Sequence, residues 1–238
     1  MPHMNEHIVK SYEGELNALT AETVRMGGLA EAAVADCLQA VVKRDQELAL
    51  AVVARDERLD IAERDIERRA IRLIALRQPM ANDLRKTVAA MKIANNLERI
   101  GDLAKNISKR TLVILEEEPM NSPLTRSIER MGKLVLNRLT AVLDAYSRSD
   151  LERAQAVWSQ DDEVDEHYNS LFRELLTYMM GDPRTITACT HMLFAAKNLE
   201  RIGDHATNIA ELVHYEITGE EMIGANRPRI DPLQGSAP

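Results

Sequence analysis

Two nearly identical segments of this chain each carry a glutamate and an aspartate four residues apart. Residues 96–107 read NLERIGDLAKNI and residues 198–209 read NLERIGDHATNI, with ten of twelve positions identical. A spacing of four places two carboxylates on one face of a helix, where like charges destabilise it by about 0.2–0.5 kcal/mol. Because the chain repeats this unfavourable arrangement, we expect the carboxylates to have a function. The two pairs are Glu98 with Asp102 and Glu200 with Asp204.

Further carboxylates lie at matching distances on the other side of a predicted turn. Asp60 and Glu98 each lie nineteen residues from Pro79. Asp56 and Asp102 each lie twenty-three residues from the same proline. Each helical residue rises about 1.5 Å, so equal distances along an antiparallel helix pair mean equal height. The second half has the same symmetry, and we predict four carboxylates at two levels in each half: Asp56, Asp60, Glu98 and Asp102, and then Asp161, Asp165, Glu200 and Asp204.

Clustered carboxylates allow three interpretations. As metal ligands, all-oxygen donors would select a hard cation such as iron, Mn²⁺, Mg²⁺ or Ca²⁺. Acid–base catalysis is disfavoured because no nucleophile, glycine-rich loop or histidine constellation accompanies them, so we do not expect an enzyme. The third interpretation is a solvated acidic face, whose cationic partners would be Arg58, Arg99, Arg201 or Lys105.

The elements that position these residues are predicted to be helices. Aromatic residues make up only 3% of the chain, and the abundant Ala, Leu, Arg and Glu are helix formers. A shift of 105 residues aligns Asp45 with Asp150, and the shift is 102 at the NLERIGD motif, which indicates a duplication. Each half contains three stretches with helical periodicity: residues 16–43, 46–76 and 81–116, and then 123–146, 150–180 and 184–217. We therefore predict an all-α fold, a tandem duplication of two antiparallel three-helix bundles.

Local signals place the boundaries of these bundles. Asp45 and Asp182 are expected N-caps. Gly101 and Gly203 each cost about 1 kcal/mol relative to Ala within a helix, which suggests that another helix approaches closely there. The predicted domains are residues 1–118, residues 122–219 and a disordered tail at residues 220–238 that is rich in Gly and Pro.

Composition disfavours several classes of partner and location. A formal net charge of −8 argues against nucleic acid, because phosphate binding requires a face of Lys and Arg. Two cysteines do not form a disulfide framework, and a reduced cytosolic setting is the better expectation. No run approaches the roughly 18–20 apolar residues of a membrane span. We expect a cytoplasmic protein.

The motifs together resemble the PhoU family of phosphate transport system accessory and regulatory proteins. The shared features are two three-helix bundles, an acidic pair in each middle helix, and NLERIGDxAxNI in each last helix. The segment RQPMANDLR at residues 77–85 is also typical of the family's first half, whereas GDPRTIT replaces that turn in the second half. The resemblance covers about residues 7–219. It maps the family's metal-binding E(D)xxxD motifs onto Asp56/Asp60, Glu98/Asp102, Asp161/Asp165 and Glu200/Asp204.

The resemblance implies a signalling function. Members of this family report adequate phosphate from the high-affinity phosphate ABC transporter to a membrane histidine kinase, repress the phosphate-starvation response and restrain uptake. It also implies a homodimer, with the transporter's cytoplasmic ATPase and the sensor kinase as partners, and multinuclear iron or another metal in some members. Two other functions stay open: a metal-buffering helical protein, and a metal-independent scaffold whose acidic stripes bind basic partners.

Overall fold

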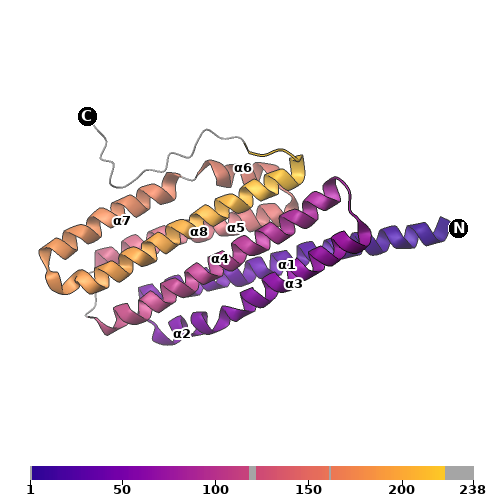
Figure 1. The fold of residues 1–238 in the computed structure, drawn as a ribbon. Helices are drawn as coiled ribbons and strands as arrows, with labels where there is room; N and C mark the ends of the chain where they lie inside the picture. Colours follow the sequence, from indigo (N-terminus) through magenta and orange to yellow (C-terminus); the bar gives the residue numbers. More distant parts are fainter. Residues whose placement is uncertain (1, 118–121, 161, 223–238) are drawn as a thin grey trace.

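The computed structural model describes residues 2–117, 122–160 and 162–222, and within these ranges it describes side chains from residue 12 except those of residues 122 and 123. In this part of the chain the backbone forms only helices and connecting turns, which confirms the all-α class (Figure 1). Residues 118–121, where the two predicted domains meet, and residues 223–238 of the predicted tail lie outside the described residues.

The helices follow the predicted order, with three stretches in each half. The elements are α1 (Pro2–Lys43), α2 (Gln46–Arg55), α3 (Glu57–Arg77) and α4 (Asn82–Glu116), then α5 (Ser122–Arg148), α6 (Leu151–Ser159), α7 (Asp162–Gly181), the 3₁₀ turn η1 (Pro183–Thr185) and α8 (Ile186–Thr218). The first helix begins well before the residue 16 that periodicity predicted.

The last helices of the two halves form the centre of the molecule. Figure 1 shows α4 and α8 running side by side in opposite directions. In the first half α1, α2 and α3 pack on α4, in the second half α5, α6 and α7 pack on α8, and α1 also packs on α5. The buried apolar residues form one cluster with members from both halves. The duplicated bundles therefore share a core, and the two NLERIGD motifs lie on neighbouring helices.

Side-chain caps fix where the middle helices begin. The carboxylate of Asp45 accepts the backbone N–H of Leu48 at 2.9 Å, and its counterpart Asp150 accepts that of Arg153 at 3.0 Å. Asp182 accepts the backbone N–H of Arg184 at 3.0 Å and caps the 3₁₀ turn that leads into α8. These bonds satisfy N–H groups that the first helical turn leaves without partners. They confirm the N-caps predicted at Asp45 and Asp182.

The prediction of one continuous middle helix in each half is wrong. The helix breaks at Asp56 in the first half and between Ser159 and Asp162 in the second. At Asp56 the backbone hydrogen bonds shift toward the tighter 3₁₀ pattern. The Asp56 carbonyl accepts the N–H of Leu59 at 2.8 Å, and the N–H of Asp60 lies farther from it, at 3.4 Å. Helices bend sharply where a side chain intrudes on the hydrogen-bond ladder. A cationic side chain lies beside each break, as described below, and periodicity alone does not show it.

Candidate functional site

In the first half, Glu98 on α4 lies among carboxylates from α3. Its side chain is 19% exposed, and its Oε2 accepts no hydrogen bond but lies 3.4 Å from Arg99 Nε. Burial raises the pKa of Glu98, and the guanidinium of Arg99 opposes that shift. Three neighbouring carboxylates, those of Asp102, Asp60 and Glu63, raise the pKa further. Asp60 therefore interacts electrostatically with Glu98, and so does Glu63, a neighbour that sequence spacing missed.

At the level of Asp56 and Asp102 in the first half, a lysine lies between the carboxylates. The ammonium of Lys105 on α4 contacts the carboxylate of Asp56 in a short ion pair and lies 3.4 Å from Asp102 Oδ1. Asp56 is only 6% exposed. The hydrogen bond to Asp56 raises the pKa of Lys105, and Asp102 adds to that shift. Asp56 and Asp102 therefore lie at one level, as predicted, with a lysine between them.

Gly101 allows this close approach. A Cβ at Gly101 would overlap Cδ1 of Leu59 on α3 and would lie 3.6 Å from Asp56 Oδ1. At the equivalent Gly203, a Cβ would lie 3.5 Å from the nearest methyl of Val164, an ordinary contact. A helix therefore approaches both motif glycines, α3 at Gly101 and α7 at Gly203, but only at Gly101 is it too close for a methyl group.

In the second half, Glu200 forms an ion pair with a lysine of its own helix. Lys197 Nζ donates to Glu200 Oε1 at 2.6 Å, while Glu200 Oε2 is buried and accepts no hydrogen bond. Asp165 and Asp204 are half-buried. Asp161, which completes the predicted set, lies outside the described residues.

A buried arginine lies beside the break between α6 and α7. Arg138 on α5 is 3% exposed. Its Nη2 donates to the carbonyl of Val157 and to Oγ1 of Thr207, both at 3.1 Å. Val157 belongs to the last turn of α6, and its carbonyl also accepts the backbone N–H of Gln160 at 3.4 Å, so the guanidinium adds a second, shorter hydrogen bond at the helix end. Sequence analysis missed Arg138, and the available signal was a charged residue among the apolar positions of the stretch KLVLNRLTAVL.

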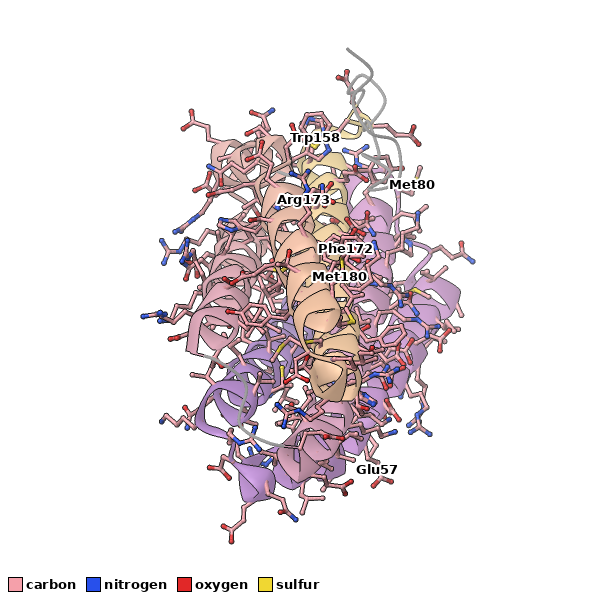
Figure 2. All side chains as sticks on the ribbon, turned by 90° about the vertical axis from the view of Figure 1, so that its left-hand side faces the viewer. Glu57, Met80, Trp158, Phe172, Arg173 and Met180 are labelled. Atoms are coloured by element: carbon pink, nitrogen blue, oxygen red, sulfur yellow. The ribbon has the colours of Figure 1, made fainter. Side chains whose placement is uncertain are left out.

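The two halves differ in the residues that surround the motif glutamates. At the positions of Glu63 and Glu67 the second half has Tyr168 and Phe172, whose ring centroids are 6.3 Å apart. Figure 2 shows Phe172 on α7. Lys197 Nζ lies 5.2 Å from the centre of the Tyr168 ring, a cation–π contact. At these two positions the first half therefore has carboxylates where the second half has aromatic rings.

Asn96 and His205 connect the two motifs across the centre of the molecule. His205 Nδ1 lies 2.9 Å from Asn96 Oδ1, so the imidazole donates to the amide oxygen. Burial lowers the pKa of His205, and the guanidinium groups of Arg201 and Arg99 lower it further. The lowered pKa favours the neutral imidazole, whose hydrogen bond joins α8 to α4.

An open groove beside the first-half cluster joins residues of both halves. Its volume is about 730 Å³, and it lies between α3, α4 and α8. Its polar lining consists mainly of acids and amides: Glu63, Glu67, Asn95, Asn96, Asn208 and Glu211. Glu211 in turn accepts the indole N–H of Trp158 at 3.1 Å. The groove gives solutes access to the acidic side of the motifs.

The donor types suit a hard cation, but their positions do not yet make a metal site. Within residues whose side chains are described, no three His, Cys, Asp or Glu groups lie close enough together to hold a metal ion. In the first half Lys105 separates Asp56 from Asp102. The buried oxygens of Glu98 and Glu200 that accept no hydrogen bond are the best available donors. A metal held by Asp56 and Asp102 would have to displace Lys105.

None of the described helices is both long enough and apolar enough to cross a membrane.

Comparisons with known proteins agree with this architecture. The PhoU domain family matches residues 23–111 and 128–213, one segment in each half. A curated relative from Caulobacter vibrioides, the phosphate-specific transport system accessory protein PhoU homolog, is 68% identical over 97% of this chain and 99% of its own length.

Two solved structures share the fold. The crystal structure of PhoU from Pseudomonas aeruginosa has a TM-score of 0.84 and 38% sequence identity, and covers 88% of this chain and 100% of its own. The structure of the phosphate transport system regulatory protein PhoU from Streptococcus pneumoniae has a TM-score of 0.82 and 29% identity, over 89% and 99% of the two chains. With both halves matched and a close relative aligned along nearly its whole length, this chain belongs to the PhoU family.

Proposed function

We propose that this protein is an accessory and regulatory protein of a phosphate transport system. The observation that carries the proposal is the pair of PhoU domains, together with 68% identity to a relative named for that role. In the finer form of the proposal, the protein couples the high-affinity phosphate ABC transporter to a sensor histidine kinase. It would repress the phosphate-starvation response and restrain phosphate uptake when phosphate is plentiful. The proposed location is the cytoplasm, at the inner membrane when partners are bound.

The shape of the molecule supports a binding role. Long helices that share one core present extended, rigid faces, and partner binding to such a face can bias one state of a kinase by differential affinity. The C-terminal half of α3 offers one such face, because a groove of about 660 Å³ beside it is lined by arginines. These are Arg68, Arg69, Arg72 and Arg77. Three of them already form ion pairs within the chain: Arg68 with Asp65, Arg69 with Glu22 and Arg77 with Glu15. An acidic surface on a partner protein would compete with these acids for the guanidinium groups.

The test is alkaline phosphatase activity in phosphate-replete cells that lack the gene. We expect high activity on deletion and low activity when the wild-type gene is restored. A strain carrying Glu98→Ala, Asp102→Ala, Glu200→Ala and Asp204→Ala tests whether the motif carboxylates take part, provided that the variant accumulates to the wild-type level. Low activity in the deletion strain would contradict the proposal.

Metal binding by the motif carboxylates is a second proposed property. The buried oxygens of Glu98 and Glu200 that accept no hydrogen bond favour it, and iron, Mn²⁺, Mg²⁺ and Ca²⁺ are the candidate ions. A metal-buffering protein would load many ions per chain, whereas a regulatory centre would load a few. Metal content after loading and gel filtration separates these two. If chelation changes nothing and raised salt weakens partner binding, the metal-independent scaffold is the better description.

A further inference from the structure

We propose that the side-chain cations of Lys105 and Arg138 take the place of a metal ion at the two helix breaks. The chain then needs no metal ion at either break, and the two cations exclude a metal ion from these sites. The break site of the first half is the space beside Asp56, and that of the second half is the space beside the carbonyl of Val157. The proposal builds on the metal-binding property proposed above and says where in each half a metal is not required.

The two cations reach equivalent places from non-equivalent positions. Lys105 extends from α4, and the residue at its position in the second half is Thr207. Arg138 extends from α5, and the residue at its position in the first half is Ala33. Arg138 donates to Thr207 itself, so its guanidinium lies at the second-half location that corresponds to Lys105. In each half a cation thus contacts the break from a helix other than the broken one, α4 in the first half and α5 in the second.

The small residues of the first half leave the space that an arginine fills in the second. Ala33, Gly101 and Asp56 line a cavity of about 150 Å³ beside the first break. In the second half the corresponding location contains the side chain of Arg138. Arg55 and Arg58 also line this cavity, and Arg55 pairs with Asp36 at 2.9 Å. The cation that contacts the carboxylate of Asp56 is the ammonium of Lys105, which reaches it from α4.

The contacts of Lys105 are those of a bridging cation. Its ammonium contacts Asp56 and lies 3.4 Å from Asp102, one carboxylate from each of the two motif pairs of the first half. A metal that bridges α3 and α4 at this level would need the same two oxygen donors and would repel the ammonium. Since Asp56 is 6% exposed, leaving it without a cation would be costly. Lysine and metal are therefore alternative occupants of one site.

The experiment measures Mn²⁺ binding to the purified, metal-free chain by calorimetry, together with the melting temperature with and without Mn²⁺. The test variant is Lys105→Met, which keeps most of the side-chain volume and removes the charge. Lys109→Met is the matched control, because Lys109 is an exposed lysine one helical turn further along α4. Asp56→Asn/Lys105→Met removes both members of the ion pair.

We expect Lys105→Met to melt on the order of 10 °C lower than the wild type in the absence of metal. Mn²⁺ should restore much of that loss and should bind about tenfold or more tightly than to the wild type. The control Lys109→Met should behave as the wild type, and the double variant should melt higher than Lys105→Met and gain no Mn²⁺ affinity. Equal Mn²⁺ affinity of the wild type and Lys105→Met would overturn the proposal.

If the Lys105→Met variant does not fold without metal, its refolding still tests the proposal. Refolding that succeeds only when Mn²⁺ is present supports a shared site. Failure with and without Mn²⁺, while the double variant folds, shows that a metal cannot replace the lysine and overturns the proposal. These measurements use only the purified chain, so their failure leaves the proposed role in phosphate regulation untouched. Conversely, a variant that loses repression in cells but binds Mn²⁺ as the wild type does would show that the regulatory role and the metal exclusion are separate properties.

Discussion

The two motif glycines provide a matched pair of substitutions in the same sequence context. Replacing either one with alanine within a helix gains about 1 kcal/mol of helix propensity. At Gly203 the new methyl would meet Val164 at 3.5 Å, so the full gain should appear. For a chain of this size about 1 kcal/mol corresponds to a rise of about 2–4 °C in melting temperature.

At Gly101 the same methyl would overlap Leu59, which is 2% exposed and has little room to move. Overpacking of this kind costs about 1–3 kcal/mol. Because the propensity gain is common to both variants, the difference between their unfolding free energies reports the overlap alone. We therefore expect Gly101→Ala to be less stable than Gly203→Ala by about 1–3 kcal/mol.

Urea denaturation followed by far-UV circular dichroism measures this difference, provided that the dependence of unfolding free energy on urea is the same for both variants. A third variant tests the cause. Leu59→Val installs the residue that the second half has at this position, and together with Gly101→Ala it should recover part of the lost stability. The reasoning is refuted if Gly101→Ala is as stable as Gly203→Ala, or if Leu59→Val brings no recovery.

Three further outcomes are expected. Because the halves share one core, the fluorescence of Trp158, the single tryptophan, and the far-UV signal should show one unfolding midpoint; two separated midpoints would contradict the shared core. Burial raises the pKa of Glu216 to about 7, above its unfolded value of 4.5, so the wild type should lose stability as pH rises between these values. Glu216→Gln should therefore be the more stable protein at about pH 8, by up to about 3 kcal/mol, and this advantage should vanish near pH 4.5; thermal melts at both pH values measure it. Arg138→Met should cost about 2–4 kcal/mol, since the hydrogen bonds of a buried cation to Val157 and Thr207 are lost, and urea midpoints that match the wild type would contradict this.

Much of the fold could be predicted because its determinants are local and repeated. Helical periodicity, the N-caps at Asp45 and Asp182 and the alignment of the two halves lie in short stretches of sequence. The level match of Asp56 with Asp102, both within reach of Lys105, also followed, because it depends only on the rise per residue in an antiparallel pair.

The break in each middle helix could not be predicted in the same way. Its neighbours come from other elements: Lys105 is 49 residues from Asp56, and Arg138 is 19 residues from Val157. Sequence analysis named Lys105 only as one of four candidate partners for an acidic face, because spacing along one helix cannot rank contacts that tertiary packing decides. The antiparallel pairing of α4 with α8, which joins His205 to Asn96, depends on that packing as well.

Direct assembly tests the proposed coupling of transporter and kinase. The protein, the purified ATPase subunit of the phosphate transporter and the cytoplasmic part of the sensor kinase would be mixed and analysed by gel filtration with light scattering. The account predicts one peak whose mass contains all three components, weakened when Arg68 and Arg72 are changed to glutamate. Three separate peaks, or binding to only one of the two partners, would contradict a coupling role.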